Sequence, residues 1–342
     1  MKSHQVTIKD IARELGVSPS TVSRALKDHP DISPATRHQV KELVEKLKYK
    51  PNAVALSLRS RRSYIIAVVV PEIVHYFFSS VISGIEDVAI DAGYNVMIFQ
   101  SNEKYEREVH ITQLLASNQV DGVLVSISKT TKNFSHLREL INDGLPLVFF
   151  DRACEEIEAD KVVVDDFIGA FNAVEHLIKT GCRRIAHFAA PQHLQIGYQR
   201  KRGYISALEK HRIEPDEALM VKCDTHDEAL KLTPEIMRLD NPPDAIFAVN
   251  DLTAIGALKA LKQMRFRIPE DVSIIGFTNG MVATVTDPEM SSVDQYASDM
   301  GKKAMEMLLN RIDAPELNHP AITETISTEL VLRGTTRPFP SS

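Results

Sequence analysis

Hydroxyl and basic side chains are concentrated at helical spacing between Pro19 and Lys27. The apolar residues of this segment fall on one side of a predicted helix, and the other side carries five small polar or basic residues: Ser20, Thr21, Ser23, Arg24 and Lys27. Such a face can enter the major groove of a nucleic-acid duplex. The Arg24 guanidinium can then donate to guanine O6 and N7, and Ser20 can reach a base edge. The hydroxyls of Thr21 and Ser23 can contact phosphates.

Two further helices are predicted around this segment. Thr7 begins a Thr-x-x-Asp capping pattern followed by apolar residues at i, i+3, i+4 and i+7, so a first helix is expected to end at Gly16. Ser18-Pro19 supplies a helix cap and a first helical residue, and Ser33-Pro34 repeats that start signal for a third helix. Two helices around a tight turn predict a helix-turn-helix.

Charge is divided unevenly along the chain. Residues 1–62 hold 13 Lys and Arg and 6 Asp and Glu, a net charge of +7. The totals of 40 basic and 46 acidic residues leave 27 and 40 for residues 63–342, a net charge of −13. A basic head on an acidic body favours a nucleic-acid contact at the N-terminal end. The helix spacing alone is also compatible with a small three-helix module that has a solvated charged face.

The segment after Tyr49-Lys50-Pro51-Asn52 reads AVALSLRSRR and mixes apolar with basic residues. It is too short to be a stable helix by itself, but it can fold where two copies meet on DNA and present a leucine as a minor-groove wedge. A plain interdomain linker is the alternative.

These motifs together resemble the lactose-repressor (LacI/GalR) family. The matching residues are Thr7-Ile8-Lys9-Asp10-Ile11-Ala12, Gly16-Val17-Ser18, Thr21-Val22-Ser23-Arg24, Ser33-Pro34-Ala35-Thr36-Arg37, Leu47-Lys48-Tyr49 and Pro51-Asn52-Ala53. The resemblance implies that Pro19, Ser20 and Arg24 read bases and that Leu58 is the hinge leucine. Lys27 stands where the family commonly has Asn, which suggests a general phosphate contact. The other DNA contacts that the resemblance implies are Thr7, Ser18, Ser33, Arg37, Tyr49 and Asn52.

From Tyr64 onward, apolar runs alternate with amphipathic segments, which predicts a parallel α/β fold. Strands are expected at Ile65–Val70, Asn95–Gln100, Gly122–Ser126, Leu147–Phe150, Lys161–Val164, Arg184–Phe188, Ala245–Val249 and Ser273–Gly276. Helices are expected near residues 78–92, 106–117, 168–180, 200–211, 226–238, 251–264 and 297–311. A single sheet that contained all these strands would have more strands than the sheet of a compact domain usually has.

The family resemblance continues through this region and implies two doubly wound lobes of the periplasmic-binding-protein type, so the expected fold class is α + α/β. We expect a helix-turn-helix domain at residues 1–50, a hinge helix and linker at 51–63, and an effector-binding and dimerisation domain at 64–342. The first lobe is expected to hold about residues 64–164 and 296–325, and the second about residues 165–292 and 326–342.

Ligands of such sheets bind beyond the carboxyl ends of the strands. The loops expected there carry Phe77-Phe78, Ser126-Ser128, Asp151-Arg152, Arg200, Asn250-Asp251, Thr278-Asn279 and Gln295. This mixture of aromatic, bidentate-donor and carboxylate groups suits a small sugar-like molecule, because rings stack on apolar sugar faces and charged groups bind hydroxyls.

The resemblance implies that four of these residues are polar effector contacts: Asp151, Arg200, Asn250 and Gln295. It also implies that Phe78 is an aromatic wall. Thr278 stands where many relatives carry Asp, and the loss of that ionised acceptor favours a phosphorylated or acidic sugar over a neutral hexose. The predicted effector site is therefore Phe77, Phe78, Asp151, Arg152, Arg200, Asn250, Thr278 and Gln295.

Several of these residues have a purely structural alternative. Asp151 and Asn250 can be loop residues or helix caps, and the cap role is favoured for Asp251. Phe77 suits a core position equally well. Arg200 lies in the run Arg200-Lys201-Arg202 at a predicted helix start, where an unfavourable helix dipole favours a binding role.

Catalytic and metal-binding patterns are absent from the sequence, so we expect neither an enzyme nor a metal or cofactor. GxGxxG, GxxxxGK[ST], GxSxG and HExxH do not occur, and the three cysteines lie far apart, as expected of core residues: Cys154, Cys182 and Cys223. The longest apolar stretch, Ile65 to Pro71, is far shorter than a membrane span. The N-terminal residues MKSHQVTIKD lack an apolar signal region, which favours a cytoplasmic protein.

The predicted function is a homodimeric, sequence-specific DNA-binding transcriptional regulator, most simply a repressor. It would bind a near-palindromic operator and respond to a small sugar or sugar-derived effector. A sugar-binding enzyme or receptor domain fused to a helical interaction module is one alternative. An architectural DNA protein without sequence specificity is another.

Overall fold

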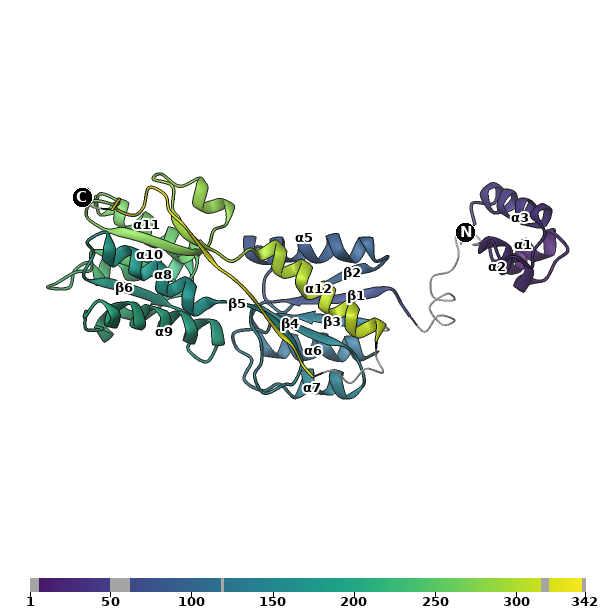
Figure 1. The fold of residues 1–342 in the computed structure, drawn as a ribbon, viewed down its shortest axis with the longest axis horizontal. Helices are drawn as coiled ribbons and strands as arrows, with labels where there is room; N and C mark the ends of the chain where they lie inside the picture. The colour runs from purple at the N-terminus through teal and green to yellow at the C-terminus, as the bar shows by residue number, and fades with distance from the viewer. Residues whose placement is uncertain (1–5, 50–61, 118–119, 315–319, 340–342) are drawn as a thin grey trace. The chain divides into compact units, whose positions relative to one another are not determined.

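The computed structural model describes residues 6–49, 62–117, 120–314 and 320–339. The chain forms two compact units that meet in sequence at Tyr64, a small helical head and a large α/β body (Figure 1).

The head consists of α1 (Ile8–Glu14), α2 (Pro19–Leu26) and α3 (Pro34–Lys46). Each helix begins at a predicted capping side chain, because Thr7, Ser18 and Ser33 accept the backbone N–H three residues on. α1 ends in a Schellman motif in which the N–H of Val17 donates to the carbonyl of Ala12 and Gly16 has a φ of 64°. The buried core comprises Ile11, Ala12, Val22, Ala25, Val40 and Leu43. The predicted helix-turn-helix is therefore confirmed.

The first lobe of the body is a doubly wound parallel sheet in the strand order β11-β5-β4-β3-β1-β2. Its strands are β1 (Ile65–Val70), β2 (Asn95–Gln100), β3 (Gly122–Val125), β4 (Leu147–Phe150), β5 (Asp160–Val164) and β11 (Thr323–Ile326). Its helices are α5 (Tyr76–Asp91), α6 (Tyr105–Ser117), α7 (Ser135–Asn142) and α12 (Ala297–Asp313). Alternate residues of β1 point to opposite faces: Val68 packs with α5 and α12, and Val69 packs with α6 and α7.

The second lobe repeats this design in the order β12-β10-β9-β8-β6-β7, with only β12 antiparallel to its neighbour. Its strands are β6 (Ile185–Ala189), β7 (Met220–Lys222), β8 (Ala245–Ala248), β9 (Ser273–Thr278), β10 (Ser291–Asp294) and β12 (Glu329–Val331). Its helices are α8 (Asp166–Lys179), α9 (Gln195–Lys210), α10 (His226–Ile236) and α11 (Asp251–Gln263), with short 3₁₀ turns at Glu217–Leu219 and Met281–Thr284. α8 and α9 cover one face of the sheet, and α10 and α11 cover the other.

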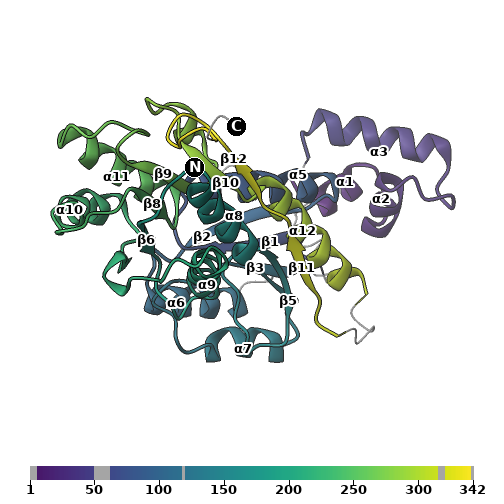
Figure 2. The same cartoon turned by 60° about the vertical axis from the view of Figure 1, so that its left-hand side comes forward.

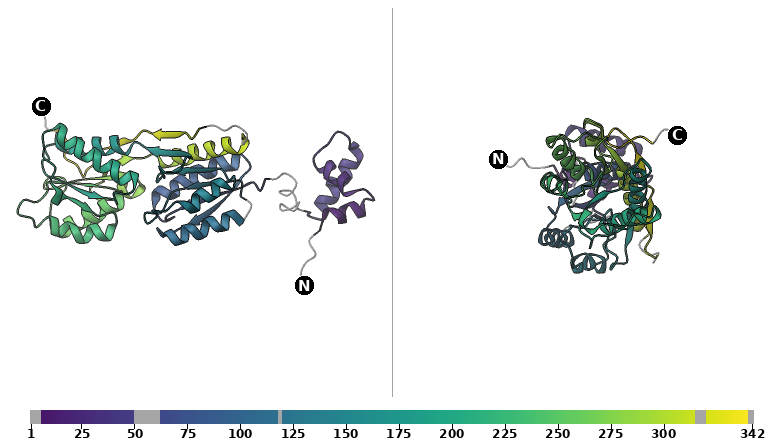
Figure 3. Two further views of the ribbon diagram at one scale, coloured as in Figure 1. Left: turned by 90° about the horizontal axis from the view of Figure 1, so that it is seen from below. Right: turned by 90° about the vertical axis from the view of Figure 1, so that its left-hand side faces the viewer.

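The chain crosses between the lobes after β5, after β10 and after β11, and its C-terminal segment runs along both lobes (Figure 3). The two-lobed α/β architecture is thus the predicted one. Among the described α-helices and strands, five were not predicted: α7, β7, β10, β11 and β12.

Helices α5 and α12 lie side by side over the first sheet and approach closely at two glycines (Figure 2). A Cβ atom on Gly301 would lie 2.0 Å from the carbonyl oxygen of Val81, and one on Gly84 would lie 2.0 Å from that of Ser298. Because both obstacles are backbone atoms, no side-chain rotation can make room for a methyl group.

Gly301→Ala should therefore lower the free energy of unfolding of the body by more than about 2 kcal/mol, although alanine is the better helix former. Urea unfolding monitored by far-UV circular dichroism measures this change. Glu306→Ala, at an exposed position of the same helix, is the matched control and should stay within about 0.5 kcal/mol of the parent. Equal values for the two variants would mean that the helix contact is looser than described.

Candidate functional site

A cavity of about 740 Å³ lies between the two lobes of the body. Its lining residues follow the carboxyl ends of strands from both sheets: β1, β2, β3, β4, β6, β7, β8, β9 and β10. Parallel strands place these ends on one edge of each sheet, and the two edges face each other across the cavity.

All eight residues of the predicted effector site line this cavity: Phe77, Phe78, Asp151, Arg152, Arg200, Asn250, Thr278 and Gln295. Among the other loop residues named from the sequence, Asp251 also lines it, whereas Ser126, Ser128 and Asn279 do not. The structure therefore brings the predicted set together, and effector binding by these residues stays a prediction.

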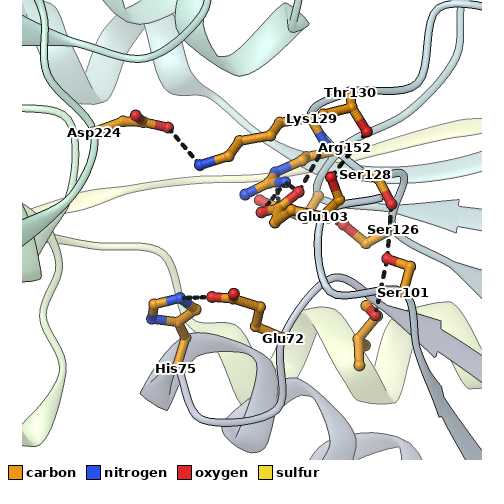
Figure 4. A network of polar contacts seen from close by, with 12 residues as sticks. Glu72, His75, Ser101, Glu103, Ser126, Ser128, Lys129, Thr130, Arg152 and Asp224 are labelled. Atoms are coloured by element: carbon orange, nitrogen blue, oxygen red, sulfur yellow. Dashed lines mark hydrogen bonds and ion pairs between the residues drawn. The ribbon is translucent and has the colours of Figure 1, made fainter. Parts of the chain in front are cut away.

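The wall of the first lobe is aromatic and cationic. The rings of Phe77 and Phe78 meet edge to face with centroids 5.2 Å apart, and both side chains are largely buried, so they belong to the core as well as to the cavity. The Arg152 guanidinium lies 5.9 Å from the centroid of Phe78. It also donates to both carboxylate oxygens of Glu103, at 2.8 and 2.9 Å (Figure 4).

Asp151 is a buried carboxylate with little hydrogen bonding of its own. Its closest side-chain contacts are the Ser126 hydroxyl at 3.5 Å and Nε of Arg152 at 3.8 Å. Burial raises the pKa of Asp151 to about 6, although the charges of Arg152 and Arg200 oppose this rise. Its φ of 59° is unusual for a residue with a side chain. The carboxylate is therefore free to accept hydrogen bonds from hydroxyl groups of a ligand.

Arg200 bridges elements of the second lobe. Its Nε and Nη2 donate to Asp166 at 2.8 and 2.7 Å, its Nη1 donates to the carbonyl of Val249, and its guanidinium lies 3.7 Å from the centroid of the Phe277 ring. The predicted position at a helix start is wrong, because α9 begins at Gln195 and Arg200 lies in its second turn. The helix-dipole argument therefore does not apply to Arg200. Its buried charge is instead compensated by the ion pair with Asp166.

Asn250, not Asp251, caps α11. The Asn250 side-chain oxygen accepts the N–H of Thr253 at 2.8 Å, and its amide nitrogen donates to the carbonyl of Asp224 at 3.0 Å. The favoured cap role of Asp251 is therefore wrong. Its carboxylate instead accepts the N–H of Gly280 at 2.8 Å and the Ser292 hydroxyl at 2.5 Å, and burial raises its pKa to about 6 despite these bonds. Asp251 holds the loop after β9 in place.

Thr278, at the end of β9, and Gln295, directly after β10, both line the cavity and are hydrogen-bonded to each other. The Thr278 hydroxyl donates to the side-chain oxygen of Gln295 at 3.1 Å, and Gln295 is buried. Thr278 has a φ of 140°, which is strained for a β-branched residue. The next residue, Asn279, is fixed by bonds to Ser292 and Asp294. Rigid neighbours thus maintain the strained backbone at this wall.

The polar face of the head is exposed as expected from the sequence. Pro19, Ser20, Arg24 and Lys27 are exposed, and Thr21 and Ser23 are partly exposed. The Ser18 hydroxyl, besides capping α2, lies 2.7 Å from that of Ser20 and 2.8 Å from that of Thr21.

The remaining predicted DNA contacts have mixed surroundings. Thr7 and Ser33 are exposed helix caps, and Arg37 and Tyr49 are partly buried, with Tyr49 packed against the head core. Asn52 and Leu58 lie outside the described residues.

In the described parts of the chain, no group of three or more His, Cys, Asp or Glu residues could hold a metal ion. The three cysteines are buried and unpaired by disulfides. Among the described helices, none is both long and apolar enough to cross a membrane.

Comparison with known proteins identifies both parts of the chain. Residues 7–52 match the model for bacterial regulatory proteins of the lacI family, and residues 174–336 match that for a periplasmic binding protein-like domain. Catabolite control protein A of Priestia megaterium is 32% identical, over 89% of this chain and 91% of its own length. The transcriptional repressor CytR of Escherichia coli K12 is 32% identical over 98% and 97%. The chain belongs to the LacI family.

Solved structures of the LacI family agree with this assignment. The regulator CelR, solved in complex with cellobiose, matches with a TM-score of 0.74 and 30% identity over 96% of this chain and 99% of its own. The lac repressor dimer bound to operator and an anti-inducer matches with a TM-score of 0.86 over 98% and 100% at 22% identity, which supports the fold.

Sequence reasoning missed several polar residues of this LacI-family cavity. Glu103, Lys129 and Asp224 line it, and each follows the carboxyl end of a strand, so the same rule would have found Glu103 and Lys129 after the predicted strands. Asp224 follows β7, which has only three residues and was not predicted.

The pKa of Asp151 predicts how stability changes with pH. An Asp in the unfolded chain has an ordinary pKa near 3.8, whereas burial raises the pKa of Asp151 in the folded protein to about 6, so the folded state binds more protons between these pH values. Its contribution to stability is therefore lost as pH rises through this window. Asp151→Asn should raise the free energy of unfolding by about 2 kcal/mol more at about pH 7.5 than at about pH 4.

Denaturant unfolding of both proteins at the two pH values tests this expectation. Asp143→Asn, at an exposed position of the same lobe, is the control and should change the free energy of unfolding by less than about 0.5 kcal/mol at either pH. If Asp151→Asn raised the free energy of unfolding by the same amount at both pH values, the charge of Asp151 would not be what destabilises the folded protein.

Proposed function

We propose that this protein is a homodimeric, sequence-specific transcriptional repressor whose operator binding is controlled by a small, uncharged, sugar-like effector in the interlobe cavity. The main supporting observation is that one chain joins an exposed, basic recognition face in a LacI-type head to a cavity between two lobes that is lined by both aromatic and polar side chains. The protein would bind its effector without turning it over, and it would act in the cytoplasm, where bacterial DNA lies.

On the DNA side, α2 is the proposed recognition helix. Arg24 would donate to a guanine, Ser20 and Pro19 would face neighbouring base edges, and Lys27 would contact a phosphate. In a dimer the two heads would read half-sites in successive major grooves, so the operator should be near-palindromic. Leu58 would enter the minor groove between them, if the hinge segments pair there.

Dimerisation is supported by apolar surface on the first lobe. β2 is an edge strand of its sheet. The side chains of consecutive strand residues point to opposite faces of a sheet, yet both Met97 and Ile98 of β2 are exposed. Ile90 of the adjacent α5 is 70% exposed. An apolar sheet edge left open in this way invites pairing with another chain, and a second copy of this protein is the proposed partner.

The cavity favours an uncharged ligand. Each lysine or arginine that lines it is paired with a carboxylate: Lys129 with Asp224, Arg152 with Glu103 and Arg200 with Asp166. A phosphate would have to displace one of these carboxylates, and it would also approach Asp151. Hydroxyl groups, which donate and accept, can bind Asp151 and the arginines without separating any pair. This arrangement argues against the phosphorylated or acidic sugar that Thr278 suggested.

The primary test is selection of binding sites from a random duplex library by the purified full-length protein, at roughly physiological salt. Enrichment of a palindrome with half-sites about one helical turn apart is the expected result. Enrichment of no sequence, with or without added sugars, would contradict the assignment as a specific repressor.

Two variants then separate base reading from phosphate attraction. Arg24→Ala should weaken binding to the selected operator by about 1–3 kcal/mol and relax the preference at one base pair of each half-site. Lys27→Ala should keep the sequence preference and lower the slope of log affinity against log salt by about one per head. Repeating the selection and the salt titration with each variant measures both effects, and an unchanged preference in Arg24→Ala would exclude it as a base reader.

A further inference from the structure

A loop of the first lobe, residues 126–131, contacts the second lobe through Lys129, and part of this network is drawn in Figure 4. Nζ of Lys129 lies 3.3 Å from Oδ2 of Asp224, which belongs to the second lobe. The carbonyl of Lys129 also lies 2.7 Å from Nε2 of His193, another residue of the second lobe. We call Lys129, Asp224 and His193 the interlobe latch.

The loop that carries Lys129 is held firmly by the first lobe. The fully buried carboxylate of Glu108 accepts the N–H of Ser128 at 2.7 Å and the hydroxyl of Thr131 at 2.9 Å. The hydroxyls of Ser101 and Ser128 lie 2.7 Å apart. Because its neighbours on both sides are fixed, Lys129 has a defined starting point from which to reach Asp224.

Glu103 links this loop to the effector cavity. One of its carboxylate oxygens accepts the N–H of Lys129 at 2.7 Å, and the same carboxylate binds the Arg152 guanidinium at 2.8 and 2.9 Å. The Thr130 hydroxyl donates to the backbone carbonyl of Glu103 at 2.8 Å. A single side chain therefore contacts both a cavity arginine and the residue that reaches the other lobe.

In the second lobe, Asp224 is itself hydrogen-bonded to a residue that lines the cavity. The carbonyl of Asp224 accepts the amide of Asn250, which lines the cavity and caps α11. The Lys129 and Asp224 side chains are 30% and 12% exposed, so their charges are only partly screened by solvent.

We infer that Glu103 is a positioning residue that couples the cavity to the interlobe latch. It orients Arg152 toward the ligand and Lys129 toward Asp224 at once, so a ligand that moves Arg152 changes how tightly the lobes are held together. The regulatory meaning of this coupling rests on the proposed function of the cavity as an effector site. The existence of the latch does not.

Hydrogen–deuterium exchange of the full-length protein, with no sugar or DNA added, tests the latch directly. Lys129→Met should speed exchange roughly threefold to tenfold in the second-lobe segments 190–197 and 222–228. Lys129→Arg should retain the parent rates, because the cation is kept. Lys132→Met removes the charge of a nearby exposed lysine and is the matched control, which should leave both segments unchanged.

Charge exchange separates the ion pair from a general loss of structure. Lys129→Asp should speed exchange in the two segments, and the double variant Lys129→Asp with Asp224→Lys should bring it back toward the parent. Unchanged exchange in α8 would show that the variants remain folded. If Lys129→Met behaves like Lys132→Met, or if the double variant is no slower than the single one, the latch is refuted.

Glu103→Gln tests the coupling. It preserves the size of the side chain but weakens its hold on Arg152 and Lys129, so segment 190–197 should exchange faster although Glu103 has no described bond to the second lobe. Parent-like exchange in that segment would refute the positioning role. Operator selection is a separate measurement, so failure of the latch and failure of the repressor assignment are distinguishable.

Discussion

The direction of the parallel strands is the constraint on which this site depends. Every strand of the first sheet is parallel to its neighbours, as is every strand of the second except β12, so the loops after the carboxyl ends gather on one edge of each sheet. Crossings after β5, β10 and β11 set these two edges against each other. Residues as distant in sequence as Phe78 and Gln295 therefore line one cavity.

The same arrangement buries charged side chains in the cavity wall. Whether a buried charge has an ion-pair partner determines how much it destabilises the folded protein. Arg200 is paired with Asp166 and Arg152 with Glu103, so neither cation is buried without a counter-charge. Asp151 has no comparable partner, and burial raises its pKa to about 6. A buried carboxylate without an ion-pair partner in the wall of a cavity destabilises the folded protein but provides a hydrogen-bond acceptor for a ligand, so stability is exchanged for binding.

Local signals in the sequence suffice for the head and for most of the body. Thr7, Ser18 and Ser33 mark helix starts because each cap satisfies a backbone N–H of its own first turn. The alternation of apolar runs and amphipathic helices implies that the strands are parallel. For this reason the sequence could predict that the eight residues named for the cavity lie together.

Other features depend on tertiary contacts that no short window contains. β10 and β11 are short and rich in Ser, Thr and Asp or Glu, so they resemble loops until a neighbouring strand is placed beside them. Arg200 and Asp251 were misplaced because helix boundaries are uncertain by several residues. The partners of Lys129 lie 64 and 95 residues away along the chain, so the latch follows only from the fold.

The central claim, that an uncharged molecule in this cavity controls operator binding, is tested most directly by fluorescence anisotropy on the selected operator. A panel of neutral sugars and their phosphates would be titrated against the parent and against Asp151→Asn. The account predicts that a neutral sugar shifts the operator Kd of the parent, that its phosphate does not, and that Asp151→Asn binds operator normally but loses the response. A response to the phosphate alone, or an unchanged response in Asp151→Asn, would contradict it.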